Sequence, residues 1–226
     1  MNNVSPEVAF APEQLQAIYE AVFRSATTQP GFYYQDLGTQ MDSKTFRQKM
    51  IALKEGLSEI CTLRANKQLN FQGIGRFSHQ QTSRFHRDSA EAHSFLMLGY
   101  EPTKVDSKVY VADYTKYIED QNMSLADYFG GDQDVNIANN EQLLVPYITK
   151  LAPFPKDHYR LLLANNSKSF EEKTFGVFHR GEVPQAIEGA DRVLNYMTLH
   201  LCDQGVEDQY DAQTIADFIH TEQVNR

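Results

Sequence analysis

The stretch Arg84-Phe85-His86-Arg87-Asp88 carries a histidine and an aspartate two residues apart in a segment of β-strand character. Successive side chains of an extended strand alternate between its faces, so His86 and Asp88 point the same way and Arg87 the opposite way. A second histidine, His179, lies far downstream in Gly-Val-Phe-His-Arg-Gly, residues 176–181. Beside the first, it completes two nitrogens and one oxygen on one face of a metal, the ligand set suited to non-haem Fe(II) with open coordination positions.

Neighbouring residues allow further predictions. The same alternation sends Arg84 to the face of His86 and Asp88, so we expect Arg84 either to contact a substrate or cosubstrate or to pair with an acidic residue at the rim. Arg180 directly follows the distal histidine and is expected to face away from the metal. Residues 165–166, Asn-Asn, can form a turn or reach the site, and the turn is the favoured interpretation.

The first 65 residues predict two helices. Residues 42–60 carry apolar residues at spacings of three and four, which is typical of a helix with one buried stripe. These apolar residues are Phe46, Met50, Leu53, Leu57 and Ile60. Residues 12–24 form a second amphipathic pattern. We expect both helices to pack on the outside of a sheet, with the aromatic run of residues 31–34 clustered between them.

From residue 71 the pattern changes to short runs of aromatic and β-branched residues interrupted by turn residues, which is typical of strands. The predicted strands span residues 71–77, 84–88, 94–100, 108–114, 158–164, 174–179 and 192–201. Residues 121–151 have helical and turn character, and we interpret them as an insertion or lid beside the site. Residues 211–220 predict a final helix.

We expect the 226 residues to form one domain. Its parts are a helical N-terminal support (1–65), a β core (about 70–202) and a C-terminal helix (about 210–221). The hydrophobic content of 41% is ample for a core and argues against disorder. A formal net charge of -9 disfavours nucleic acid and anionic membrane surfaces as partners. A small molecule is the favoured substrate, and a protein side chain is the alternative.

The compartment is predicted from three features. Cys61 and Cys202 are too few for a disulfide framework and are interpreted as reduced thiols. The first six residues, Met-Asn-Asn-Val-Ser-Pro, lack the basic start and apolar run of a signal peptide. No stretch approaches the roughly 20 apolar residues of a membrane span. We therefore expect a cytoplasmic protein.

An arginine extends the metal-ligand pattern: Arg192 follows His179 by 13 residues. The His-x-Asp triplet, the long gap, the distal histidine and this arginine together resemble the 2-oxoglutarate- and Fe(II)-dependent oxygenase superfamily, over roughly residues 71–201. The resemblance implies an α+β, mainly β fold: a double-stranded β-helix (jelly-roll, cupin-like) flanked by N-terminal helices. It also implies that His86, Asp88 and His179 hold iron.

For Arg192 the resemblance implies a pairing with the distal carboxylate of 2-oxoglutarate. A planar guanidinium can grip a carboxylate through two parallel hydrogen bonds. Members of the superfamily often carry a Ser or Thr two residues beyond this arginine, where this chain has Leu194. Tyr100 and Tyr110 are the candidates for supplying the missing hydroxyl, and the sequence does not choose between them.

The activity that the resemblance implies is a dioxygenase reaction. Iron, 2-oxoglutarate and O2 would oxidise a small-molecule substrate, most simply by hydroxylation, with release of succinate and CO2. Asp88 argues against halide transfer, because similar enzymes that transfer halide lack this carboxylate. Two alternatives stay open: a non-catalytic cupin-like protein that binds a metal or ligand, and a metal hydrolase or isomerase of the same barrel class, which would not need Arg192. The sequence identifies neither the substrate nor the oligomeric state.

Overall fold

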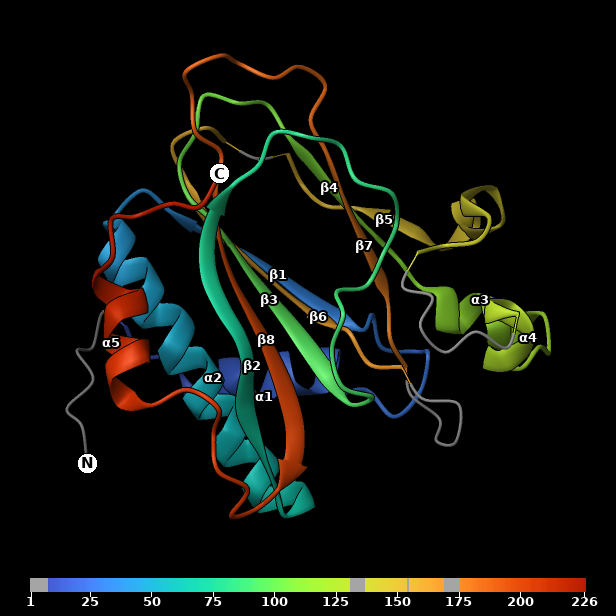
Figure 1. Cartoon of the computed structure of the whole chain (residues 1–226). Helices are drawn as coiled ribbons and strands as arrows, with labels where there is room; N and C mark the ends of the chain where they lie inside the picture. Colours follow the sequence, from blue (N-terminus) through green and yellow to red (C-terminus); the bar gives the residue numbers. More distant parts are fainter. Residues whose placement is uncertain (1–7, 131–136, 154, 169–174) are drawn as a thin grey trace.

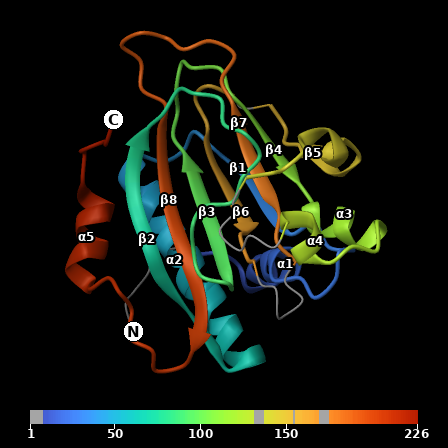
Figure 2. The ribbon, with the colours of Figure 1, turned by 45° about the vertical axis from the view of Figure 1, so that its right-hand side comes forward.

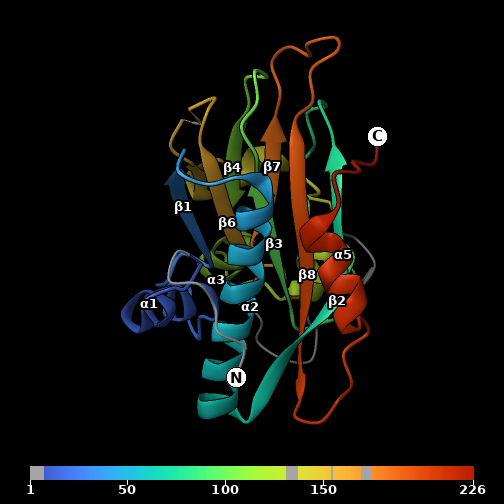
Figure 3. The same cartoon turned by 90° about the vertical axis from the view of Figure 1, so that its left-hand side faces the viewer.

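The computed structural model describes residues 8–130, 137–153, 155–168 and 175–226, and these form three layers (Figures 1 and 3). Helices cover one face of a five-stranded antiparallel sheet of order β1-β6-β3-β8-β2, and a three-stranded antiparallel sheet of order β5-β4-β7 packs on its other face. The strands are β1 Phe32–Gly38, β2 Lys67–Ser78, β3 Ser94–Tyr100, β4 Lys108–Ala112, β5 Ile148–Lys150, β6 Tyr159–Asn165, β7 Phe178–Glu182 and β8 Val193–Asp203. The helices are α1 Pro12–Val22, α2 Ser43–Ala65, α3 Tyr114–Asp120, α4 Leu125–Phe129, the 3-10 helix η1 Glu141–Tyr147 and α5 Ala212–His220.

The long helix α2 lies along the outer face of the large sheet (Figure 3). It starts where the Asp42 carboxylate accepts a hydrogen bond from the Thr45 N–H over 2.7 Å, and it ends at Asn66 in the left-handed conformation. Four residues of its predicted apolar stripe are buried in one cluster with residues of β2, β3, β6 and β8, and the fifth, Ile60, is half-buried. The four are Phe46, Met50, Leu53 and Leu57. The predicted position of this helix outside the sheet is therefore confirmed.

The two sheets face each other through an apolar core. Alternation along β3 sends Phe95 and Met97 toward the helices and Leu96 and Leu98 toward the small sheet. There the latter two lie in one cluster with the buried valines of β4. The space between the sheets is thus lined by even-numbered residues of β3 and by Leu194 and Tyr196 of β8, which belong to the same cluster.

Several predicted elements hold and others need correction. The structure confirms a mixed architecture in which helices flank antiparallel sheets, although helices are about as extensive as strands, and β3 matches its predicted range 94–100. Residues 84–88 are not a strand, because His86 alone forms isolated bridges there. The predicted strand 108–114 ends at Ala112, since the Asp113 carboxylate caps α3 through the Lys116 N–H. Of the predicted strand 174–179, Thr174 lies outside the described residues and β7 begins at Phe178.

The aromatic run of residues 31–34 belongs to a strand that the sequence did not predict. Residues 32–38 form β1, which pairs with β6 at the edge of the large sheet. The insertion predicted over residues 121–151 contains α4, η1 and β5, and its residues 131–136 lie outside the described parts. Figure 2 shows α3 and α4 on the side of the molecule opposite α5. In the described ranges no helix combines the length and apolar composition needed to cross a membrane.

Buried ion pairs tie the helices to the large sheet. Glu101, directly after β3, accepts hydrogen bonds from Arg76 of β2 over 3.0 Å and lies 3.4 Å from Arg47 of α2. Arg47 in turn donates to the Ile219 carbonyl near the end of α5 over 2.9 Å. One carboxylate therefore joins β2, β3 and α2, and Arg47 extends the network to α5.

Replacing Glu101 should show how much this network of buried ion pairs contributes to the free energy of unfolding. Glu101→Ala is expected to lower the free energy of unfolding by about 3–5 kcal/mol, because it leaves two buried guanidinium groups without their carboxylate. Urea denaturation followed by circular dichroism measures the change. Asp203→Ala, which removes an exposed ion pair to Lys67, serves as the control and should leave the urea midpoint unchanged. Equal destabilisation of the two variants would contradict the role of the buried network.

Candidate metal centre

Two histidines far apart in the sequence lie side by side. The His86 N–H donates to the His179 carbonyl over 3.0 Å, and the His179 N–H donates to the His86 carbonyl over 2.9 Å. Residues that exchange both backbone hydrogen bonds in an antiparallel pair project their side chains to the same side. The imidazole centroids are accordingly 4.2 Å apart.

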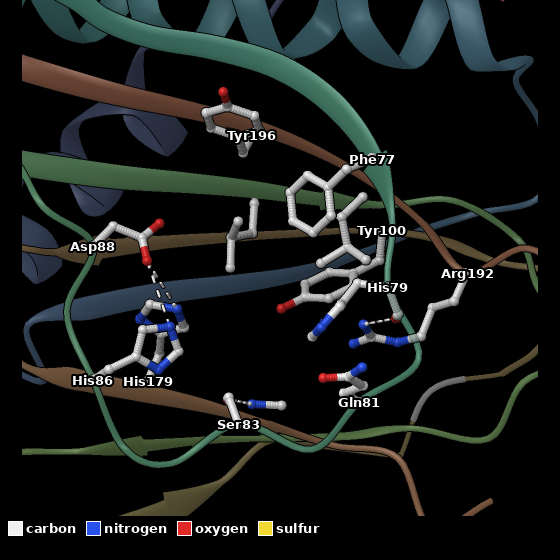
Figure 4. Close-up of a pocket in the computed structure, with 13 residues that line it drawn as sticks. Phe77, His79, Gln81, Ser83, His86, Asp88, Tyr100, His179, Arg192 and Tyr196 are labelled. Carbon is white, nitrogen blue, oxygen red and sulfur yellow. Dashed lines mark hydrogen bonds and ion pairs between the residues drawn. The ribbon is translucent and has the colours of Figure 1, made fainter. Parts of the chain in front are cut away.

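Asp88 completes the cluster. One of its carboxylate oxygens, Oδ1, lies 3.5 Å from His86 Nε2 and 3.8 Å from His179 Nε2. One candidate ligand atom from each of the three residues lies within 4.8 Å of the others. Figure 4 shows the three side chains converging at one end of a cavity. Two imidazole nitrogens and one carboxylate oxygen, with no fourth protein ligand among the described residues, form a donor set that fits Fe(II) with open positions.

The imidazoles are prepared for metal binding by their surroundings. His86 Nδ1 lies 2.8 Å from the Arg84 carbonyl and donates a hydrogen bond to it, so in the neutral ring Nε2 carries the lone pair that a metal would need. Burial lowers the pKa of His179 to about 4, so its ring is neutral at physiological pH. Burial raises the pKa of Asp88, but the hydrogen bond from protonated His86 and the charges that His179 and His86 carry when protonated outweigh burial and lower the net pKa of Asp88.

The cavity has a volume of about 370 Å³ and extends from the metal ligands to Arg192 (Figure 4). Its walls come from the inner face of β3 and β8, from the end of β2 and from the loop that follows it. The lining residues are Phe77, His79, Gln81, Ser83, His86, Asp88, Leu98, Tyr100, His179, Gly181, Arg192, Leu194 and Tyr196.

Arg192 places a buried positive charge at the far end of this cavity. The residue is 4% exposed, and its Nη1 donates to the His79 carbonyl over 3.1 Å. Nε has no hydrogen-bond partner, and no carboxylate in the described ranges lies within ion-pair distance of the guanidinium. Burial lowers the pKa of Arg192, although the group stays charged. Since a buried unpaired charge is costly, this end of the cavity fits an anion.

Of the two tyrosines predicted to assist Arg192, the structure brings only Tyr100 into the cavity. Its ring lies 5.5 Å from the Arg192 guanidinium carbon, and burial raises its pKa to about 12, so the hydroxyl is neutral and can donate a hydrogen bond. Tyr110 lies on the opposite face of β4, because Val109 and Val111 on either side of it point between the sheets. Its ring packs against Arg180 instead.

Arg84 also lies outside the cavity. Its guanidinium donates to the Ala138 carbonyl over 2.9 Å and forms an ion pair with Glu141 over 3.8 Å, and its side chain is 63% exposed. The alternative prediction, a rim arginine paired with an acidic residue, is therefore confirmed, and the substrate contact is not. The prediction assumed a regular strand over residues 84–88, whereas only His86 is bridged there, to Ile137 and to His179. Alternation thus holds for His86 and Asp88 and fails for Arg84. Arg180 is paired with Glu141 and Glu182, away from the metal ligands, as the sequence indicated.

Several lining residues were not predicted. Tyr196 lies four residues after Arg192 on β8, so strand alternation could have identified it. His79, Gln81 and Ser83 come from an irregular loop that gives no periodic signal. Asn166 reaches the backbone of Asp88 through two hydrogen bonds, although the sequence favoured a turn there.

Comparison with known proteins gives limited similarity. No family model and no curated protein matches the chain. Among solved structures, this chain is similar to the Kdo hydroxylase KdoO in complex with succinate and Fe(III), which is described as a non-heme Fe(II) alphaketoglutarate dependent dioxygenase. The two share 11% sequence identity and a TM-score of 0.38, over 90% of this chain and 88% of that chain. Its complex with alphaketoglutarate and Fe(III) matches with a TM-score of 0.34, over 87% of this chain and 86% of that chain.

These structures come from the superfamily that the sequence motif resembles. An identity of 11% and TM-scores below 0.5 do not define the activity or the substrate of this chain.

The pKa values of the two histidines should be shifted in opposite directions from the ordinary value of 6.5. Burial lowers the pKa of His86, but its hydrogen bonds to Asp88 and the Arg84 carbonyl prevail and raise the net pKa. As the pH falls, His86 should take up its proton first and His179 only near pH 4. NMR of the histidine ring nitrogens in the metal-free protein measures both pKa values. The affinity of the protein for Mn(II) should fall as the pH drops through the pKa of His86.

Asp88→Asn supplies the control for this titration. Removing the carboxylate should bring the His86 pKa down, because the hydrogen bond to the Arg84 carbonyl then opposes burial without the help of Asp88. If His179 took up its proton at a higher pH than His86, the expected opposite shifts of the two pKa values would be contradicted.

Proposed function

We propose that this chain is an Fe(II)- and 2-oxoglutarate-dependent dioxygenase that oxidises a small molecule. One observation supports this above all: the same cavity holds two histidines and a carboxylate at one end and a buried guanidinium without a carboxylate partner among the described residues at the other. A metal hydrolase would use the triad but would have no need of the guanidinium.

The residues present fit the iron and the cosubstrate. His86, Asp88 and His179 would hold Fe(II) and leave positions open, while Arg192 would bind the distal carboxylate of 2-oxoglutarate. When bound, iron and 2-oxoglutarate supply the oxidising chemistry with O2, in which the cosubstrate is converted to succinate and CO2.

The protein's own contribution is binding, orientation and exclusion of water. Arg192 offers a planar fork to the carboxylate, and the Tyr100 hydroxyl can donate a further hydrogen bond in place of the serine or threonine that Leu194 replaces. The apolar side chains of Phe77, Leu98 and Leu194 line the path between these groups and the metal ligands. In such surroundings the guanidinium–carboxylate attraction is much stronger than in water.

The proposal extends to the fold and the reaction type. Two antiparallel sheets that face each other, with the metal ligands at one end of the cavity between them, support a double-stranded β-helix of the jelly-roll kind within a single domain. Hydroxylation is the simplest reaction for this site, because Asp88 is present as a candidate metal ligand and its carboxylate argues against halide transfer. The cavity volume of about 370 Å³ suits a small cosubstrate.

Anaerobic titration of the metal-free protein with Fe(II) and then 2-oxoglutarate tests the proposal. We expect a visible metal-to-ligand charge-transfer band in the wild type and none in His179→Ala. Arg192→Met should still bind Fe(II) but weaken 2-oxoglutarate binding roughly 100-fold, because loss of one partner of a buried charge pair costs several kcal/mol. Arg226→Met, which removes an exposed arginine paired with Asp191, is the control and should bind like the wild type.

Oxygen-dependent succinate formation separates the remaining possibilities. A non-catalytic cupin-like protein would bind the metal and form no succinate. A metal hydrolase or isomerase would give no charge-transfer band and would keep its activity in Arg192→Met. Either result would overturn the dioxygenase proposal.

A further inference from the structure

The side chain of Asn166, directly after β6, holds the backbone of Asp88. The Asp88 N–H donates to Asn166 Oδ1 over 3.0 Å, and Asn166 Nδ2 donates to the Asp88 carbonyl over 3.0 Å. Asp88 has no bridge partner of its own, since the isolated bridges described in this loop involve His86. The amide therefore provides Asp88 with the two hydrogen bonds that a neighbouring strand would otherwise supply.

Asn166 is itself fixed by the end of the large sheet. The residue is 1% exposed, and its N–H donates to the carbonyl of Ser94, the first residue of β3, over 2.9 Å. Asn166 Nδ2 also donates to Ser94 Oγ over 3.1 Å, and Ser94 Oγ donates to the Asn166 carbonyl over 3.1 Å. These bonds set the orientation of the amide, so its oxygen must face the Asp88 N–H.

We propose that Asn166 is a positioning residue that aims the Asp88 carboxylate at the metal, an inference that rests on the proposed function. The carboxylate of an aspartate lies only two bonds from its backbone, so a shift of the Asp88 backbone moves the ligand oxygen almost equally. Asn166 touches neither histidine; it acts on the metal through Asp88. Hydrogen-bonding partners of metal ligands typically change metal affinity by about 10- to 100-fold.

The preceding residue offers a matched control. Asn165 is 4% exposed, and its side chain also makes two hydrogen bonds to backbone groups. These go to the Val22 carbonyl and the Ser167 N–H, both over 3.0 Å, and to no metal ligand. Asn165→Ala and Asn166→Ala therefore remove similar buried amides, and only the second disturbs Asp88.

Titration of each metal-free variant with Mn(II) alone, followed by the EPR signal of free Mn(II), tests the inference. Asn166→Ala should bind Mn(II) about 10-fold or more weakly than the wild type, and Asn165→Ala should bind within about twofold of it. Asn166→Asp keeps an acceptor for the Asp88 N–H but loses the donor to its carbonyl, so its affinity should be intermediate. This variant decides the question if Asn166→Ala does not fold.

Two results would overturn the inference. If Asn166→Ala or folded Asn166→Asp bound Mn(II) as tightly as the wild type, Asn166 would not act on the metal. If Asn165→Ala weakened Mn(II) binding as much as Asn166→Ala, Asn166 would act only on stability. Neither result would affect the proposed function, which depends on the wild type. A wild type that binds Mn(II) but gives no charge-transfer band with Fe(II) and 2-oxoglutarate would overturn the proposed function and leave the Asn166 effect measurable. A wild type that binds no metal would overturn both.

Discussion

Two backbone hydrogen bonds between His86 and His179 are the interaction on which the whole site depends. They join a loop to β7 across 93 residues of sequence, which is the separation of positions 86 and 179. Because the pair is antiparallel and both bonds are made, the imidazoles must project together. The candidate ligand set of His86, Asp88 and His179 depends on this pairing, because it brings the two rings together and Asp88 needs only to reach them.

The loop that carries His86 and Asp88 is supported from two directions. On the inner side Asn166 holds the Asp88 backbone. On the outer side the Glu141 carboxylate of η1 accepts the Phe85 N–H over 2.9 Å, and the Ala138 N–H donates to the Phe85 carbonyl over 2.9 Å. An extended segment can therefore keep alternating side chains without belonging to a sheet, which is why His86 and Asp88 share a face although no strand exists there.

The sequence predicted the parts of this structure that have a local signal. The stripe on α2 and the apolar run of β3 follow from periodicity, and the spacing of His86 and Asp88 gave their shared direction. β1 was missed because residues 32–38 are partly buried along most of their length and show no clean alternation. Asn166 and Tyr100 could not be assigned because their roles depend on contacts with distant residues. For Arg84 the shared face with His86 was wrong because a local rule was applied to a loop, whereas the alternative pairing with an acidic residue was right.

The lack of a carboxylate partner distinguishes Arg192 from three other buried arginines, Arg24, Arg47 and Arg76. Arg24 lies 2.5 Å from Asp113, and Arg76 and Arg47 share Glu101 at 3.0 and 3.4 Å, so in each case the fold supplies the carboxylate. Arg192 has no such partner within the described parts of the chain. A charge buried in this way destabilises the fold until an anion binds it. The preference for an anion at that end of the cavity therefore comes from the folding energetics of the chain. Under the proposed function, this anion is the distal carboxylate of 2-oxoglutarate.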